Sequence, residues 1–397
     1  MRFSGRTDWE LGENDLAAAL REARAAGREL VDLTVSNPTV CGFDYDAGLL
    51  APLSEAGAMV YGPEPLGTVR ARSAVARYYA DAGADVGVER ICLTTSTSEA
   101  YSFLFRLLCD AGDEVLVARP SYPLFDFLAR LDDVRLREYP LRYHDGWEID
   151  LEALEAAVGE RTRAVIVVHP NNPTGNFASE RERVALLELC ARRGLALIVD
   201  EVFLDYAVDG VRAESFAAGE SAALTFVLSG VSKVCGLPQM KASWIAACGP
   251  RALVERAMER LEVVADTFLS MNAPVQYALP AWLAGRGAIQ RQILERVREN
   301  VDVVGRAANV EMLPLEAGWA GVLRVPQSVA GPGLAEELVR ECGVIVHPGA
   351  FYGMAGEHWV VVSLIGRAEE FRLGVGNLNR WIESRKLIAV PAGSSST

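Results

Sequence analysis

Lysine is scarce in this sequence. Of its 39 basic residues only three are lysines, at positions 233, 241 and 386, so the remaining 36 are arginines. A lysine amine can form a Schiff base with a carbonyl compound, whereas a guanidinium is too stable as a cation to do so. The two lysines within "SGVSKVCGLPQMKAS", residues 229–243, are therefore the first candidates for chemistry.

Signals for a membrane, a nucleotide or a nucleic acid are also missing. The first residues, "MRFSGRTDWELGEND", are too charged for a signal peptide, and no apolar run approaches the length of a membrane span. No G-x-G-x-x-G or Walker sequence is present, which disfavours dinucleotides and nucleoside triphosphates. The net charge of −14, with both signs interleaved, argues against a nucleic acid or an anionic membrane as partner.

Cysteine and histidine set two further limits. The seven cysteines are odd in number and scattered, with no C-x-x-C pair, which is typical of reduced thiols in the cytoplasm. The four histidines have no close or helical spacing, and structural metal sites need such spacing. We therefore expect a cytoplasmic protein that binds no metal, no nucleic acid and no membrane.

The middle of the chain, residues 60–250, alternates short apolar runs with helical patterns. Continuous apolar strands between helices predict a mostly parallel sheet that is covered on both faces. We expect an α/β three-layer sandwich with a mostly parallel seven-stranded sheet in residues 51–285, and a smaller α+β domain in residues 286–397 that packs with an N-terminal arm, residues 1–50. The expected strands are "RICLTTS", "DEVLVARP", "VRLREYPL", "RAVIVVHP", "LALIVDEV", "LTFVLSG" and "ASWIAACG".

Polar side chains follow several of these strands. Hydroxyls come in "LTTSTSEA", two amides in "HPNNPTGN", Asp200 in "LIVDEVFLDY", and Lys233 in "LSGVSKVCG". Each has an ordinary interpretation, such as a helix cap for the hydroxyls or a turn for N-P-T-G. Ligands of open α/β sheets, however, bind at the carboxyl ends of the strands. An aldehyde cofactor with a phosphate and a pyridine nitrogen would use every one of these groups.

The chain resembles the fold-type I, class I/II aminotransferases, which depend on pyridoxal 5′-phosphate. The resemblance runs over nearly the whole chain and rests on six motifs in family order and spacing. They are "YGPEPLG", "TTSTSEA", "PSYP", "HPNNPTG", "VDEV" and "SGVSKVCGLP". One such motif would be weak evidence, but six in order are specific.

The resemblance implies a role for each matching residue. Lys233 would form the Schiff base with the cofactor and then carry a proton between the substrate's α-carbon and the cofactor's C4′. Asp200 would keep the pyridine nitrogen protonated, Asn172 would hydrogen-bond the ring's 3′-oxygen, and Tyr122 would stack on the ring. Tyr61 would reach the phosphate of the partner subunit's site, which implies a homodimer with composite active sites. The phosphate would be bound by Thr95, Ser96, Thr97, Ser232, Lys241 and Ser229, although Ser229 lies four residues before the lysine where the family usually has its serine three before.

Three positions depart from the family pattern. Phe203 stands where the family usually has a tyrosine that donates to the 3′-oxygen. Lys241 replaces an arginine, and an ammonium can neutralise phosphate only as a point charge. Val361, in "HWVVVSLIG", replaces the arginine that holds the substrate's α-carboxylate. The resemblance leaves three candidates for a substitute, which are Arg324, Arg367 and Arg6.

The predicted function is transfer of an amino group between an α-amino acid and an α-keto acid by a ping-pong, Schiff-base mechanism. Two alternatives stay open: another pyridoxal-phosphate reaction on a modified amino acid (β-elimination, cyclisation or oxidation), or a catalytically silent regulator that binds the cofactor. The identity of the amino acid does not follow from the sequence. Aromatic residues expected on the substrate side indicate a hydrophobic or mixed pocket: Trp9, Phe43, Tyr45, Phe351 and Tyr352.

Overall fold

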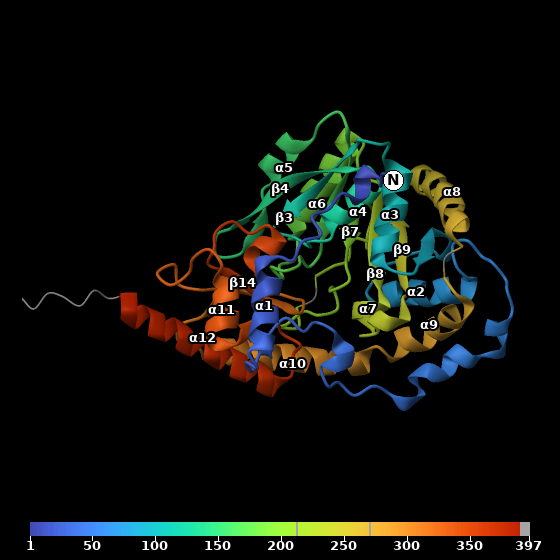
Figure 1. Cartoon of the computed structure of the whole chain (residues 1–397). Helices are drawn as coiled ribbons and strands as arrows, with labels where there is room; N and C mark the ends of the chain where they lie inside the picture. The colour runs from blue at the N-terminus through green and yellow to red at the C-terminus, as the bar shows by residue number, and fades with distance from the viewer. Residues whose placement is uncertain (212, 270, 390–397) are drawn as a thin grey trace, which may run out of the picture.

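The computed structural model describes residues 1–211, 213–269 and 271–389 (Figure 1). Within them, eight strands form one large sheet in the order β2-β9-β8-β7-β6-β3-β4-β5. Strand β9 runs antiparallel to both of its neighbours, whereas β8, β7, β6, β3 and β4 are parallel. The strands are β2 (Ile91–Thr94), β3 (Glu114–Arg119), β4 (Arg135–Tyr143), β5 (Trp147–Ile149), β6 (Thr162–Val168), β7 (Ala196–Asp200), β8 (Thr225–Gly230) and β9 (Ser243–Cys248).

Helices cover both faces of this sheet because its central strands are apolar on both sides. Every residue of β7, β8 and β9 is buried. One face packs against α2 (Val69–Asp81), α5 (Leu151–Ala157), α6 (Glu180–Arg193) and α9 (Ala273–Gly285), and the other against α3 (Thr97–Leu108), α4 (Phe125–Leu131) and α8 (Arg251–Phe268). The predicted α/β sandwich is therefore confirmed.

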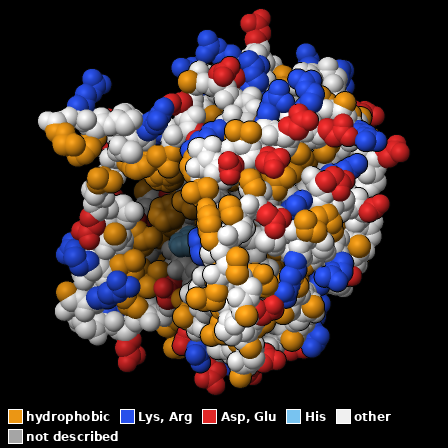
Figure 2. Space-filling view, turned by 90° about the vertical axis from the view of Figure 1, so that its right-hand side faces the viewer, with side chains coloured by type: hydrophobic (Ala, Val, Ile, Leu, Met, Phe, Trp, Pro, Cys, Tyr) orange, Lys and Arg blue, Asp and Glu red, His pale blue; other side chains and the backbone are white. Residues whose placement is uncertain are grey.

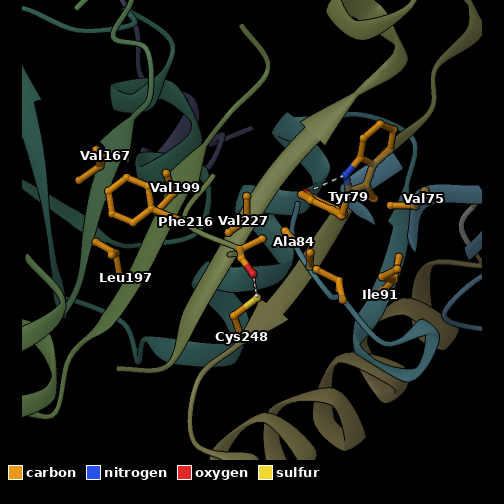
Figure 3. Close-up of a cluster of buried hydrophobic side chains, with 14 of the residues drawn as sticks. Val75, Tyr79, Ala84, Ile91, Val167, Leu197, Val199, Phe216, Val227 and Cys248 are labelled. Carbon is orange, nitrogen blue, oxygen red and sulfur yellow. Dashed lines mark hydrogen bonds between the residues drawn. The ribbon is translucent and has the colours of Figure 1, made fainter. Parts of the chain in front are cut away.

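Figure 3 shows the first of these interfaces, where side chains from helix α2 and strands β6, β7 and β8 meet. Two large aromatic side chains in this core satisfy each other's polar atoms. Trp244 Nε1 donates a hydrogen bond to Tyr79 Oη at 3.1 Å, so two large aromatic rings are buried at little polar cost.

The sheet has one strand more than the seven that the sequence predicts. The extra strand, β5, is three residues long and pairs antiparallel with β4 through Tyr143 and Trp147. A tight turn around Asp145 and Gly146 joins the two strands. So short a segment carries too little alternation to be recognised as a strand.

The smaller region combines the two ends of the chain. Strand β1 (Val31–Asp32) pairs in parallel with β12 (Val344–Ile345), and α1 (Asp15–Ala25) packs on α11 (Leu334–Cys342). Figure 1 shows α1, α11 and α12 together on the side away from α8. The remaining elements are α10 (Gly287–Gly305), α12 (Ala368–Ala389) and the sheet β10-β11-β14-β13, made of Glu311–Met312, Ala320–Arg324, Trp359–Ser363 and His347–Pro348.

The boundary predicted between residues 285 and 286 falls between helices α9 and α10. The division of the chain at residues 50 and 285 into an arm and two domains stays a prediction. None of the helices in the described residues is both long and apolar enough to cross a membrane.

Candidate active site

A cleft of about 560 Å³ lies between the carboxyl ends of the large sheet and the smaller region. Figure 2 shows a hollow in the surface with hydrophobic side chains around it and a histidine inside. Strand ends and the loops after them supply one wall of the cleft, and β11, β13 and β14 supply the other. The lining comprises Thr34, Ser36, Ser96, Thr97, Ser98, Tyr122, Pro123, Leu124, Val168, Asn172, Asp200, Val202, Phe203, Gly230, Ser232, Lys233, Pro238, Lys241, Ser243, Trp319, Ala320, His347, Tyr352, Val361, Val362 and Ser363.

Lys233 lies in α7 (Val231–Val234), a single helical turn directly after buried strand β8. Its Nζ is 4.9 Å from the ring centre of Trp319 and 5.5 Å from that of Phe203. Tyr206 Oη donates a hydrogen bond to the Lys233 carbonyl at 2.6 Å, which fixes the backbone. Burial lowers the pKa of the Lys233 amine, although the nearby Asp200 opposes this shift.

Asp200 ends strand β7, next to the strand that leads to Lys233. Its Oδ1 accepts a hydrogen bond from the Val202 N–H at 3.1 Å, and its Oδ2 accepts one from Tyr101 Oη at 3.1 Å. Burial raises the pKa of this carboxyl to about 6, and the two hydrogen bonds and Lys233 act in the opposite direction. A buried carboxylate with this setting is stabilised further by any cation that binds beside it.

The hydroxyl loop lies at the N-terminus of helix α3. Ser96 caps this helix, because its Oγ accepts a hydrogen bond from the Glu99 N–H at 3.1 Å. Ser96 and Thr97 line the cleft, and so does Ser98, the next hydroxyl of the same loop. Thr95 is not in the lining, and its N–H donates to Glu99 Oε2 at 2.6 Å.

Ser229 was predicted to bind the phosphate, but it is Ser243, to which the sequence assigned no role, that lines the cleft. Ser229 is fully buried, its Oγ has no partner among the described residues, and it does not line the cleft. Side chains alternate along a strand, so Ser229 and Gly230 face opposite sides of β8. Ser243 does line the cleft and pairs with Gly230 across β8 and β9. A Cβ on Gly230 would collide with Ser243 Oγ, so the Ser243 hydroxyl occupies the space beside Gly230.

Asn172 and Tyr122 line the cleft as predicted from the motifs. Asn172 comes shortly after strand β6. Its neighbour Asn171 does not line the cleft, and its Nδ2 donates hydrogen bonds to Pro120 O and Thr174 Oγ1. Of the five aromatic residues expected on the substrate side, Tyr352 lies in the described lining, and the other four do not. The sequence interpretation missed Tyr101 and Trp319, because a buried tyrosine or tryptophan is indistinguishable from a core residue in the sequence. It also missed Ser243, because the pairing of Ser243 with Gly230 is visible only in the sheet.

The three arginines suggested as substitutes for the missing clamp lie elsewhere. Arg6 pairs with Asp133, just before strand β4, at the opposite end of the sheet from the cleft. Arg324 pairs with Glu311 at 3.3 Å, and the Arg367 guanidinium lies against Gly42. No arginine occurs among the described residues that line the cleft. This placement gives the three candidates no support.

Tyr61 lies outside the cleft of its own chain. Its side chain is 81% exposed, in the loop between η4 (Ala56–Met59) and helix α2. Other large apolar side chains nearby in the sequence are also exposed, at Leu50, Met59, Val60 and Val69. Any contact of Tyr61 with a phosphate would therefore have to be made in a different chain.

The arrangement fits pyridoxal 5′-phosphate. A partly buried amine and a buried carboxylate stand on neighbouring strand ends, and a hydroxyl-rich helix N-terminus with Lys241 nearby suits a phosphate. No group of three or more His, Cys, Asp or Glu able to hold a metal occurs among the described residues.

Comparison with known proteins agrees with this geometry. Residues 46–375 match the family model for aminotransferase class I and II. The glutamate–pyruvate aminotransferase of Escherichia coli K12 is 28% identical over 279 residues, which is 69% of each chain. An S-alkyl-thiohydroximate lyase of Arabidopsis thaliana is 32% identical over 228 residues, 56% of this chain and 49% of that one. The solved alanine aminotransferase of Pyrococcus furiosus has the same fold, with a TM-score of 0.86 at 20% identity, covering 96% of this chain and 100% of that one. The chain therefore belongs to the class I and II aminotransferase family.

Proposed function

We infer that Lys233 and Asp200 are the catalytic residues of this pyridoxal-phosphate-dependent amino-acid aminotransferase. The observation that carries the assignment is that the partly buried Lys233 and the buried Asp200 stand at the ends of adjacent strands β8 and β7, in one cleft. When bound, pyridoxal 5′-phosphate supplies an aldehyde and an electron-withdrawing ring. Asp200 holds a proton on the ring nitrogen, and its burial makes this charge pairing strong.

Lys233 moves the proton of the reaction. Because burial lowers the pKa of its amine, more of it is neutral near pH 7 and able to accept the proton from the substrate's α-carbon. The rings of Phe203 and Trp319, whose centres are 5.3 Å apart, both lie close to the amine and limit where it can move. Asn172 and Tyr122 line the ring site, and Phe203 contributes no hydroxyl there.

The phosphate site combines neutral hydroxyls with one ammonium. Ser96, Thr97, Ser98 and Ser232 supply donors, and Ser243 fills the place that a side chain at residue 230 would take. Lys241 supplies the positive charge. Ser229 and Thr95 remain candidates only through their backbone, because their side chains do not line the cleft.

The active sites are composite in a homodimer. The exposure of Tyr61 and of the apolar residues around it supports this assembly, because exposed apolar patches mark interaction surfaces. Location in the cytoplasm rests on the scattered cysteines, all seven of which are free thiols.

Transfer of ¹⁵N tests the function directly. The cofactor-loaded protein is incubated with a ¹⁵N-labelled amino acid and an unlabelled α-keto acid, and mass spectrometry follows the label. A transaminase moves ¹⁵N to the keto acid, across a panel that includes glutamate, alanine and aromatic amino acids. The matched control is the Lys233→Ala variant, in which transfer should stop.

A second candidate is β-elimination, which the 32% identity to the Arabidopsis lyase favours. A lyase would convert an S-substituted cysteine and water into a thiol, ammonia and pyruvate, with no amino-group acceptor. The same incubation with a ¹⁵N-labelled S-substituted cysteine as the amino acid distinguishes the two reactions: ammonia without ¹⁵N transfer indicates a lyase, and ¹⁵N transfer without free ammonia indicates a transaminase.

A further inference from the structure

The wall of the cleft that faces Lys233 carries no fixed positive charge. In the described lining the basic groups other than histidine are Lys233 and Lys241, and both lie on the large-sheet side. The opposite wall contains Trp319, His347, Val361 and Ser363. Burial lowers the pKa of His347, and its Nδ1 is hydrogen-bonded to Tyr352 Oη at 3.0 Å. An amino-acid substrate therefore meets a neutral wall where its carboxylate should lie.

Two donors on this wall are buried without a partner. Trp319 is 3% exposed and Ser363 is 7% exposed, and neither Trp319 Nε1 nor Ser363 Oγ has a hydrogen-bond partner among the described residues. By contrast, Trp359 Nε1 donates to Ala355 O at 2.9 Å. Unpartnered buried donors are rare in proteins, and a ligand is one of the common explanations.

Ser363 lies on strand β14, Trp319 immediately precedes strand β11, and these two strands are paired. Ser363 on β14 is paired with Ala320 on β11, and Trp319 immediately precedes Ala320. The N–H of Leu364 donates to the Trp319 carbonyl at 2.7 Å, which continues the pairing by one residue. The backbone thus holds Trp319 and Ser363 at the same end of this strand pair, where both line the cleft. The Lys233 Nζ is 4.9 Å from the Trp319 ring centre.

Val361 completes the wall with apolar surface. It packs with Leu313, Val322 and Met354 in a small buried cluster, and it is paired with Val322 and His347 across the sheet. An arginine at this position would have to displace that cluster. This wall therefore combines apolar packing with neutral hydrogen-bond donors and leaves no room for an arginine at position 361.

We propose that the Nε1–H of Trp319 and the hydroxyl of Ser363 bind the α-carboxylate of the substrate in place of an arginine. This inference rests on the proposed function, because it places the substrate's α-carbon beside Lys233. Neutral donors bind a carboxylate less strongly than a guanidinium does, and they bind an uncharged carbonyl oxygen almost as well. The site consequently discriminates weakly between an amino acid and its amide.

Three variants test the assignment in the cofactor-loaded protein: Trp319→Phe, Ser363→Ala and, as matched control, Trp359→Phe. Single-turnover rates are measured with L-alanine and L-alaninamide, and calorimetry measures the binding of L-lactate and L-lactamide, which lack the amine and cannot react. Wild type should prefer each acid over its amide by less than about tenfold. Trp319→Phe and Ser363→Ala should each weaken binding of the acid by about tenfold to a hundredfold, since each removes a hydrogen bond to a charged group. Trp359→Phe should change nothing.

The proposal would be overturned if Trp319→Phe and Ser363→Ala both bound the acid as tightly as the unmodified protein does. It would also be overturned if the unmodified protein preferred the acid over the amide by more than about a thousandfold, because such a preference requires a cation. Circular dichroism and cofactor absorbance verify that each variant is folded and loaded. If Trp319→Phe fails to fold, Ser363→Ala decides alone. Failure of the proposed function gives a different pattern, in which wild type converts neither alanine nor its amide while lactate binding still depends on Trp319 and Ser363.

Discussion

Tyr101 Oη donates a hydrogen bond to Asp200 Oδ2 at 3.1 Å, across a separation of 99 residues in the sequence. Helix α3 brings Tyr101 to the carboxylate, and the same helix presents Ser96 and Thr97 at its N-terminus. One helix thus serves two parts of the proposed cofactor site. The hydrogen bond also restrains the rise in the pKa of Asp200 that burial causes.

The buried carboxyl of Asp200 should destabilise the cofactor-free protein as the pH rises. Its pKa is about 6 in the folded chain against an ordinary 3.8, so the folded state binds more protons than the unfolded state between those values. The free energy of unfolding should therefore fall from about pH 4 to pH 6 and then level off. At about 1.4 kcal/mol per pKa unit, the loss is at most about 3 kcal/mol.

Asp200→Asn removes this titration. Urea unfolding of the cofactor-free proteins gives the free energy of unfolding of the variant minus that of wild type. We expect this difference to be more positive at pH 8 than at pH 4. The same variant should bind the cofactor more weakly, because the partner of the ring nitrogen is lost. Parallel pH profiles for the two proteins would contradict the pKa shift.

Borohydride reduction should attach the cofactor to Lys233. It is the partly buried lysine of the cleft, whereas Lys241 is exposed and Lys386 is in α12, bonded to Asn309 Oδ1 at 2.9 Å. Peptide mapping of the reduced, loaded protein identifies the labelled residue. Lys233→Ala should lower single-turnover rates by about 10²–10⁴-fold, the usual contribution of a general base. A label on Lys241 or Lys386 would refute the assignment.

Gly230 and Ser243 should behave as a coupled pair. Gly230→Ser places a hydroxyl three residues before Lys233, but its Cβ collides with Ser243 Oγ, so the single variant should lose stability and cofactor. Ser243→Ala removes the closest of these contacts and one phosphate donor, while Ala242 O and the Cβ of residue 243 stay 3.0 Å from the new Cβ. We expect the double variant to bind the cofactor better than either single variant, with a coupling energy of about 0.5–3 kcal/mol. Cofactor affinities are measured by absorbance titration. If the losses of affinity in the two single variants simply add up in the double variant, residues 230 and 243 are not coupled.

Lys241 should be replaceable by arginine but not by alanine. Its backbone has φ of 53°, a left-handed conformation that arginine and alanine tolerate equally badly, so the comparison isolates the side chain. Lys241→Ala should weaken cofactor binding by about tenfold to a hundredfold, since a charged hydrogen bond is lost. Lys241→Arg should stay near wild type, and Lys386→Ala serves as the control. Equal affinities for all variants would show that phosphate is bound without Lys241.

The fold was predictable because its strands are apolar on both faces and alternate with amphipathic helices. The presence of Lys233, Asp200 and Asn172 at one cleft was predictable because ligands of such sheets bind at the carboxyl ends of the strands, where these side chains lie. Ser243 and Tyr101 were not, because their importance depends on pairing across strands and on contacts between distant segments. The arginines were misleading for a related reason: a long side chain can reach many places, and local partners such as Asp133 and Glu311 decide where it lies.

Hybrid dimers should recover activity if Tyr61 completes the partner's site. Lys233→Ala destroys the catalytic amine, and Tyr61→Ala removes a group that is exposed and distant from its own cleft. When the two variants are mixed, unfolded and refolded together, half of the dimers combine both chains, and each of these has one fully intact site. The mixture should therefore reach about a quarter of wild-type activity, well above the sum of the separately refolded variants. Light scattering verifies the dimer. A mixture no more active than its parents, or a fully active monomer, would show that each chain builds its own site.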